Sequence, residues 1–396
     1  MAYFHSPRTV TDGLVFFYDT GNSKSYVGEP TTNLLNNSIL GLGSGASLGS
    51  DGTGTYIQLA DTTTGYSRFQ LPSIPVSSND IYTWSFELMS PVDITTGYYF
   101  DTNEYSDQFP SSNDLSRVGA VHRVPSTMPA WKWQEFSLTV TMKPDLTGAY
   151  TYDFFNMFYP TFQNKKIYYR NMQFEFKDHP TQYVGQGGSR SVTQGLKDLT
   201  RNTSIDLTNV SFDSNAQITF DGTNDYINLG DNSLFDFTNG IMTVEAIIKF
   251  PSSWTAGSQY PNLISKGASA GWDTDGWSLF GFRSYGSGTG YTLGIGIRNT
   301  GTVKTTLAYD QPADTWLHVV GTLDGSSIKI YINGALVTTN SQTVNPGDNT
   351  TNVYIGRDPS SQYFPGDIPY VKVYSRALTA SEVQQNYNAV KSRFGI

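Results

Sequence analysis

The chain of 396 residues carries a formal net charge of −9, contains no cysteine, and is charged at only 15% of its positions. Without a basic patch, this charge argues against binding to nucleic acid phosphates, and the missing cysteines exclude disulfides, thiolate nucleophiles and zinc–cysteine sites. No apolar run approaches the roughly 20 residues of a membrane span, and the N-terminal residues lack a secretory signal pattern. We therefore expect no nucleic acid partner, no membrane insertion, and synthesis in a cytoplasm without a signal peptide.

Alternation of apolar and polar residues predicts β-strands along most of the chain. The first such run, residues 82–88, places an aromatic or aliphatic residue at every second position. The second run, residues 131–140, slips in phase between Trp133 and Phe136, which predicts a β-bulge. Later runs cover residues 174–176, 244–248, 293–297, 328–332 and 371–373. Period-two alternation separated by Asp-Gly, Asn-Gly and Pro-Gly turns predicts antiparallel β-sandwiches.

A single helix is well marked, at the C-terminus. Thr379 and Glu382 have the spacing of a capping box, and Leu378 and Val383 occupy the positions of a hydrophobic staple. Gly395 is a typical helix end. We expect this helix to pack on a sheet rather than to bind a partner. Residues 185–191 are rich in glycine and have no periodicity, so we place a domain boundary near residue 190.

Six segments in the second half follow one another in a specific order and spacing. They are residues 218–227, 243–248, 316–325, 330–334, 353–357 and 371–378. On these segments, residues 195–396 resemble the concanavalin A-like jelly rolls of the laminin-G-like superfamily. The resemblance implies a two-sheet sandwich for residues 191–396.

The first half resembles a second kind of module. Residues 32–38 and 167–175 are similar to the first and last strands of carbohydrate-binding-module jelly rolls, and residues 179–184 are similar to a junction in phage structural proteins. Residues 12–26 resemble the start of the laminin-G-like domain in phage proteins, where a segment like residues 197–202 follows directly.

This separation predicts that residues 31–190 are a jelly roll inserted into the laminin-G-like domain. Residues 1–30 then supply an N-terminal arm and the first strand of that domain, and residues 191–396 supply the rest. The predicted fold is therefore all-β, with two jelly-roll sandwiches and one short C-terminal helix.

Catalytic constellations are missing from the sequence. The four histidines do not combine with serine and aspartate into a recognisable triad, and no Gly-x-Ser-x-Gly elbow occurs. Glycoside hydrolysis needs two facing carboxylates, but Glu87, Glu175 and Glu245 each lack an acidic neighbour on the same strand face. We therefore expect no enzymatic activity.

Calcium is the one cofactor that we consider. Asp221, Asn224 and Asp225 offer oxygen ligands in a loop where related domains hold a structural calcium, but Ile-Pro-Tyr at residues 368–370 replaces the acidic pair usual in the family. The alternative is that these side chains only stabilise the turn. No other cofactor is predicted.

Two loops have the composition of a sugar site, with aromatic rings for the apolar faces of pyranoses and polar groups for hydroxyls. The candidate residues are Trp272, Asp273, Asp275 and Trp277 in one loop, and Tyr98, Tyr99, Asp101 and Tyr105 in the other. The alternatives are aromatic residues at the edge of the core and contacts with another protein.

The resemblance to phage structural proteins implies a bacteriophage protein on the virion surface, as a tail fibre, head fibre or capsid decoration, and we expect it to be non-enzymatic. It would bind host surface glycans or other virion proteins through loops on rigid sandwiches. The alternatives are a purely structural cement that binds no sugar and a polysaccharide-degrading glycoside hydrolase. A homo-oligomer is compatible with the sequence, although no coiled-coil stalk is present.

Overall fold

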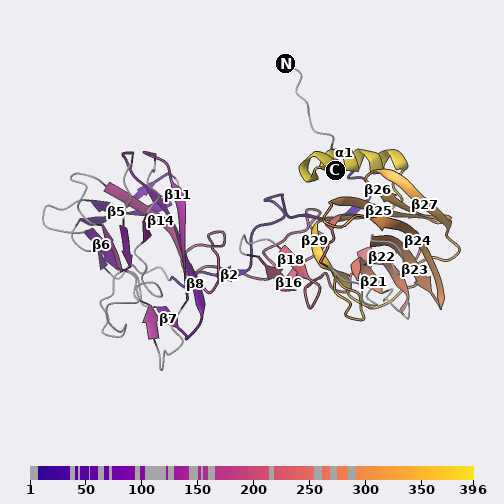
Figure 1. Cartoon of the computed structure of the whole chain (residues 1–396), viewed down its shortest axis with the longest axis horizontal. Helices are drawn as coiled ribbons and strands as arrows, with labels where there is room; N and C mark the ends of the chain where they lie inside the picture. The colour runs from indigo at the N-terminus through magenta and orange to yellow at the C-terminus, as the bar shows by residue number, and fades with distance from the viewer. Residues whose placement is uncertain are drawn as a thin grey trace, which may run out of the picture. The chain divides into compact units, whose positions relative to one another are not determined.

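The computed structural model describes residues 8–35, 41–42, 45–52, 54–60, 67–70, 74–93, 99–102, 122–123, 129–141, 150–152, 155–158, 166–213, 218–253, 261–267, 274–283 and 291–396. These residues fold into two compact units (Figure 1). Unit 1 comprises residues 8–28, 192–213 and 218–396, and unit 2 comprises residues 29–191. No helix among the described residues is long and apolar enough to cross a membrane.

Unit 1 is a sandwich of two antiparallel sheets. As far as the chain is described, the first sheet has eight strands. Its order is β17 (Ser211–Phe212), β18 (Ile218–Asp221), β29 (Pro365–Tyr374), β20 (Ile241–Lys249), β25 (Leu317–Asp324), β26 (Ser327–Ile332) and β27 (Ala335–Ser341), and β1 (Leu14–Asp19) also pairs with β29. The N-terminal strand thus lies beside the last strand of the chain, with Phe17 opposite Lys372 and Asp19 opposite Tyr370.

The second sheet of unit 1 faces the first across the core. In the described residues its order is β16 (Asp206–Asn209), β19 (Tyr226–Asn228), β28 (Val353–Ile355), β21 (Asn262–Gly267), β22 (Gly276–Arg283), β23 (Tyr291–Asn299) and β24 (Thr302–Gln311). A 3-10 turn, η1 (Ser233–Phe235), lies between β19 and β20. Side chains from both sheets, among them Phe16, Val244, Leu279, Ile295 and Val373, form one continuous apolar core. These strands confirm the all-β prediction.

Helix α1 (Ala380–Phe394) lies against the first sheet, where it packs on β25 and β27 (Figure 1). Its ends confirm the sequence prediction. Thr379 accepts a hydrogen bond from the Glu382 backbone while the Glu382 side chain accepts one from Thr379. Leu378 and Val383 are buried in one apolar cluster, and Gly395 ends the helix with a φ of 70°, a conformation that glycine adopts without strain.

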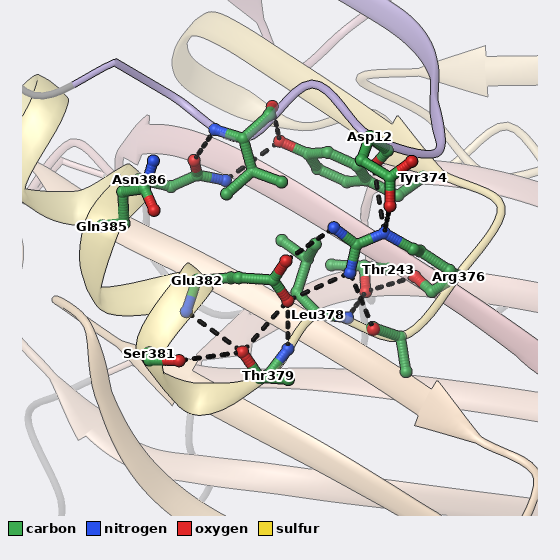
Figure 2. Close-up of polar contacts among 12 residues, drawn as sticks. Asp12, Thr243, Tyr374, Arg376, Leu378, Thr379, Ser381, Glu382, Gln385 and Asn386 are labelled. Atoms are coloured by element: carbon green, nitrogen blue, oxygen red, sulfur yellow. Dashed lines mark hydrogen bonds and ion pairs between the residues drawn. The ribbon is translucent and has the colours of Figure 1, made fainter.

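Asn386 connects α1 to the N-terminal segment and to the sheet (Figure 2). Its side-chain oxygen accepts a 2.7 Å hydrogen bond from Val10 N, and its Nδ2 donates to Glu245 at 2.6 Å and to the Tyr374 hydroxyl at 2.9 Å. Tyr374 in turn donates to Val10 O at 3.1 Å. Residue 10 is therefore held through its main chain, in addition to the burial of its side chain in an apolar cluster.

Beneath α1 the sheet carries a buried polar cluster. Glu245, His318 and Lys372 are all fully buried, and His318 Nε2 lies 3.2 Å from Glu245 Oε1. Burial alone would raise the pKa of Glu245, but Lys372 and His318 outweigh it and hold that pKa below its ordinary value. An ionised carboxylate is thus buried between α1 and the outer face of the sheet.

Unit 2 contains two five-stranded sheets within its described residues. The first runs β11 (Gln134–Thr141), β8 (Ile81–Met89), β14 (Lys166–Glu175), β5 (Gly54–Ala60) and β4 (Ala46–Asp51). The second runs β10 (His122–Arg123), β9 (Tyr99–Thr102), β13 (Phe155–Phe158), β6 (Ser67–Gln70) and β3 (Gly41–Leu42). A separate ladder joins β12 (Tyr150–Tyr152) to β7 (Ile74–Val76).

The chain enters and leaves unit 2 through a pair of short strands. In β2 (Thr31–Thr32) and β15 (Ser189–Arg190), Thr31 pairs with Arg190, and Thr32 with Ser189. Nearby, the Nε2 atom of His179 lies 2.5 Å from Glu29, and its Nδ1 lies 2.5 Å from Asp178. Burial would lower the pKa of His179, but these two carboxylates outweigh it and raise that pKa above its ordinary value.

Candidate functional site

The two faces of the β11–β8–β14–β5–β4 sheet differ in chemistry. Tyr169 pairs with Ile57, and both are buried. One residue further along each strand, Arg170 and Tyr56 share the opposite face. Glu87 pairs with Arg170 on one side and with Glu135 on the other, so it also lies on that face. We call the group Tyr56, Glu87, Trp133, Tyr168, Arg170 and Asn171 on this face the Trp133 patch.

An ion pair lies at the centre of the patch. Arg170 donates from Nε to Glu87 Oε2 at 2.7 Å, and its Nη2 lies 2.7 Å from the same oxygen. Asn171 Nδ2 donates to the other carboxylate oxygen at 2.6 Å. The two charged side chains are only 15% and 18% exposed. Because both side chains are largely buried, these charge-assisted hydrogen bonds hold them in one position, and the positive and negative charges neutralise each other.

Aromatic rings surround this ion pair. The Arg170 guanidinium lies 4.0 Å from the centre of the Trp133 ring, and the Tyr56 ring centre is 6.5 Å from Trp133 and 5.2 Å from Tyr168. Trp133 and Tyr56 are half-buried, so part of each ring remains in contact with solvent. Packing on a fixed guanidinium holds the Trp133 ring in a defined orientation.

Glycine at position 49 is needed for the placement of Tyr56. A Cβ atom at Gly49 would lie 2.4 Å from the Tyr56 ring. The ring therefore lies directly over the neighbouring strand β4, where any side chain would displace it.

A backbone irregularity orients the polar end of the patch. The β14–β8 register shifts between Arg170 and Gln173, and Asn171 has a φ of 50°. Asparagine tolerates this left-handed conformation better than most residues. The β-bulge turns the Asn171 amide toward Glu87, which a regular strand would prevent.

A hollow of about 420 Å³ adjoins the patch. It is lined by Leu48, Thr55, Tyr56, Ile57, Tyr169, Arg170, Asn171, Met172, Tyr183 and Gln186. Burial and the nearby Glu87 carboxylate raise the pKa of Tyr183 above its ordinary value, so its hydroxyl stays protonated and can donate a hydrogen bond. Together the patch and the hollow present apolar ring faces beside fixed polar groups.

Sequence reasoning did not identify this patch. Glu87, interpreted as solitary, lies opposite Glu135 of the neighbouring strand. The predicted bulge near Trp133 is also wrong, because β11 pairs with β8 without a shift from Gln134 to Thr141. The phase slip has another cause: Trp133 faces the patch and Phe136 the opposite side.

The loop that was predicted as a sugar site is described only in part. Trp272 and Asp273 lie outside the described residues. Trp277 is 1% exposed, and its Nε1 donates a 2.9 Å hydrogen bond to Phe235 O. This burial corrects the expectation that Trp277 belongs to a surface platform, because both ring faces are packed in the core.

Asp275 is fixed by protein contacts. It forms a 2.6 Å ion pair with Arg298 and accepts a 3.0 Å hydrogen bond from Thr300 N. Of the second predicted loop, Tyr98 and Tyr105 lie outside the described residues. Tyr99 and Asp101 belong to β9, of which only the backbone is described, with Tyr99 opposite Arg123 and Asp101 opposite Met157.

Two of the three calcium candidates, Asp221 and Asp225, use their carboxylate oxygens within the turn itself. Asp221 Oδ1 accepts hydrogen bonds from the Thr223 and Asn224 backbones. Asp225 is buried and accepts from Ser211 N, from the Ser211 hydroxyl and from Asp221 N. No group of three or more acidic or histidine residues with metal-binding geometry occurs in the part of the chain that the structure describes.

Comparison with known proteins identifies the C-terminal part of the chain. Residues 221–384 match the family described as the concanavalin A-like lectin/glucanases superfamily. No curated protein sequence matches the chain.

Solved structures match part of the chain at low identity and low TM-score. The binding domain of botulinum neurotoxin serotype D is 17% identical, with a TM-score of 0.37, over 50% of this chain and 49% of that one. Domain 4 of AbnA, an extracellular arabinanase from Geobacillus stearothermophilus, is 16% identical, with a TM-score of 0.36, over 50% of this chain and 93% of that one. The chain thus spans about half the length of the toxin domain. From residue 221 to residue 384, unit 1 carries a concanavalin A-like lectin/glucanase domain.

Proposed function

We propose that this protein is a non-enzymatic glycan-binding protein whose unit 2 binds saccharides on the Trp133 patch. The observation that carries the proposal is the arrangement of Trp133 and Tyr56 around the Arg170–Glu87 pair. Rings that are partly exposed beside fixed polar groups are the features by which protein sites hold the apolar C–H face and the hydroxyls of a pyranose.

The charges of the patch favour a neutral sugar. The Arg170 and Glu87 charges cancel each other at 2.7 Å, so the patch offers no uncompensated cation to a carboxylated or sulfated sugar. The Asn171 amide is already bonded to Glu87, and the Tyr183 hydroxyl beside the hollow remains a donor. Stacking and neutral hydrogen bonds are therefore the expected contributions to binding.

A glycan array with the full chain, followed by calorimetry on the best neutral oligosaccharide, tests the proposal. Trp133→Ala should weaken binding by roughly tenfold or more, since a ring stacked on a ligand contributes about 1–3 kcal/mol. Phe176→Ala is the matched control, because Phe176 is a 58% exposed aromatic residue of unit 2 outside the patch. Equal affinity of the two variants would overturn the assignment to the patch. A wild-type protein that binds no glycan would overturn the function.

One observation favours the hydrolase alternative, namely that Glu135 lies directly opposite Glu87. A hydrolase needs one carboxyl group that donates a proton and one that attacks or activates water. Both oxygens of Glu87 instead accept hydrogen bonds, from Arg170 and Asn171. We therefore expect no new reducing ends when a bound polysaccharide is incubated with the protein, whereas release that Glu135→Gln abolishes would establish an enzyme.

We further propose that the protein is displayed on a bacteriophage virion, as a tail fibre, head fibre or capsid decoration. This placement rests on residues 12–26 and 179–184, which resemble segments of phage structural proteins. Antibodies against the protein should label intact purified particles in electron microscopy. A particle surface without label would count against the placement, and labelled particles with no glycan binding would favour the structural cement.

We also propose that residues 31–190 are an insertion in the laminin-G-like domain. Two pairings support this organisation: β1 lies beside β29, and β2 lies beside β15. A chain in which residues 33–188 are replaced by a short turn should still unfold cooperatively as a folded unit 1. A molten or aggregated product would contradict the insertion.

A further inference from the structure

Unit 1 carries a second group of aromatic residues that no part of the proposed function uses. Tyr226 of β19, Tyr354 of β28 and Tyr363, which lies shortly before β29, are all half-buried. The Tyr226 ring centre is 5.7 Å from that of Tyr354 and 6.1 Å from that of Tyr363. We call these three residues the tyrosine cluster.

Arg357 lies at the centre of the cluster. The carbon atom of its guanidinium is 4.5 Å from the Tyr354 ring centre, 4.6 Å from that of Tyr226 and 5.6 Å from that of Tyr363. The faces of three rings at this distance attract a cation electrostatically, and they keep the guanidinium in place.

The charge of Arg357 is not neutralised by a carboxylate. Its Nε donates to Asp358 O at 2.9 Å, and its Nη2 is 3.4 Å from Pro359 O and from the Ser361 hydroxyl. These acceptors are neutral oxygens, and within the described residues Nη1 donates to none. Arg170 of unit 2 differs, because Glu87 cancels its charge. The chain has a net charge of −9, and the half-exposed Arg357 provides a local positive charge within it.

The three phenol groups are also available. Among the described residues, no hydrogen bond uses the hydroxyls of Tyr226, Tyr354 or Tyr363. Each hydroxyl can both donate and accept, so the cluster combines flat apolar rings, three uncommitted hydroxyls and one cation.

The loop that holds the cluster is tightly organised. Arg357 pairs with Tyr363 in an isolated antiparallel bridge. Inside this hairpin, the Asp358 carboxylate accepts from Gln362 N at 2.8 Å, and Asp358 N donates to Gln362 O at 3.1 Å. Asp358 is fully buried. The cluster is therefore preorganised, and a ligand would pay little ordering entropy there.

We propose that the tyrosine cluster and Arg357 form a second binding site, in unit 1, for an acidic saccharide that carries a carboxylate on its pyranose ring. The rings contact the apolar face of the sugar, the phenol hydroxyls bond to its hydroxyl groups, and Arg357 Nη1 donates to its carboxylate. This site is independent of the proposed function, because it uses other residues and selects acidic sugars, whereas the Trp133 patch favours neutral ones.

Calorimetry on the full chain with a trigalacturonate probe tests the site, with the methyl-esterified trisaccharide as the neutral counterpart. We expect the acid to bind and Arg357→Gln to weaken it by about tenfold, which corresponds to one charge-assisted hydrogen bond. Tyr354→Phe, which removes only a hydroxyl, should weaken it by about threefold. Lys24→Gln removes one exposed positive charge elsewhere in unit 1 and should leave the affinity unchanged.

Three results with the trisaccharide probes would overturn the proposal. The first is that trigalacturonate does not bind to the wild type, and the second is that its methyl ester binds as tightly as the acid. The third is that Arg357→Gln, shown to be folded by an unchanged urea midpoint, binds the acid as tightly as the wild type. Inorganic phosphate should bind at least tenfold more weakly than the trisaccharide; equal affinity would mean a simple anion site. Trp133→Ala should not affect this probe, so the outcome is separate from that for neutral glycans.

Discussion

Arg170 and Glu87 face each other across β14 and β8 and form a 2.7 Å ion pair beneath the Trp133 ring. Arg357 of unit 1 also lies against aromatic rings, but only neutral oxygens accept its hydrogen bonds. Both arginines therefore lie among aromatic rings, but the Trp133 patch is electrically neutral and the tyrosine cluster is positively charged. The two proposed sites therefore differ in the ligand charge that they accept. One substitution in the Trp133 patch should change its preference from neutral to acidic sugars.

Glu87→Gln should make the Trp133 patch accept acidic sugars. The substitution keeps the shape of the side chain but leaves the Arg170 charge uncompensated. Calorimetry with an acidic oligosaccharide, in the Arg357→Gln background, should detect binding that the parent lacks. Weaker binding of every glycan without any gain for acidic ones would contradict this account of the ion pair.

Gly49→Ala should weaken binding of neutral glycans several-fold with little effect on the free energy of unfolding. The new Cβ would lie 2.4 Å from the Tyr56 ring and displace it from the patch. Gly52→Ala is the matched control in the same hairpin, because a Cβ there meets no atom within 4 Å. Unchanged affinity of the Gly49 variant would show that the Tyr56 ring does not contact the sugar.

Asn386→Ala should destabilise unit 1 by roughly 2–4 kcal/mol, because a fully buried Glu245 would lose a neutral donor. The variant should also release the N-terminal segment, since Val10 N loses its acceptor. Urea unfolding and limited proteolysis near residue 10 measure the two effects. Asn388→Ala, on the same helix but outside the buried cluster, serves as the control and should behave like the wild type.

Unit 2 should lose stability as the pH rises above 6.5, the ordinary pKa of histidine. Because Glu29 and Asp178 raise the pKa of His179, the protonated ring stabilises the folded state fully below the ordinary pKa of 6.5. That contribution is lost as the pH passes through the raised value. Hydrogen exchange on peptides of unit 2, corrected for intrinsic rates, should show the loss. His179→Gln should abolish the trend, and a trend that persists would assign it to another group.

The contribution of Glu382 should have the opposite pH dependence. Its hydrogen bonds with Arg376 lower its pKa to about 2, so it stabilises α1 above the ordinary carboxyl range and loses this effect as the pH falls toward 2. At pH 6, Glu382→Gln should cost about 0.5–1 kcal/mol in urea unfolding, in keeping with a partly exposed ion pair at a helix N-terminus. The cost should shrink as the pH falls below 4.5 and disappear only below the lowered pKa of about 2.

Local signals predicted the secondary structure of the described residues well. The Thr379–Glu382 capping box and the Leu378–Val383 staple depend on residues only a few positions apart, and the structure confirms both. Trp277 was misinterpreted although a signal was available. It alternates in phase with Leu279, and this alternation places both in the core.

The Trp133 patch could not be predicted in the same way. Its members come from β5, β8, β14 and the segment before β11, and only the pairing register brings them together. Trp133 out of phase with Phe136 was a partial signal, because it places an aromatic ring on the outer face of a strand. The tyrosine cluster depends likewise on long-range pairing, since Tyr226 and Tyr354 are far apart in the sequence and meet across β19 and β28.

The pairing of Thr31 with Arg190 determines how the chain tolerates changes in unit 2. Both ends of unit 2 pair in one antiparallel ladder. The distance between the two points where the chain enters and leaves the unit is therefore fixed, as it is in a hairpin. The entropy of closing that connection then depends little on how many residues lie between the two ends. If residues 31–190 are an insertion, as proposed, we expect that a module of different length or specificity can replace residues 33–188 while unit 1 folds from the same two segments, so that ligand preference and scaffold stability change independently.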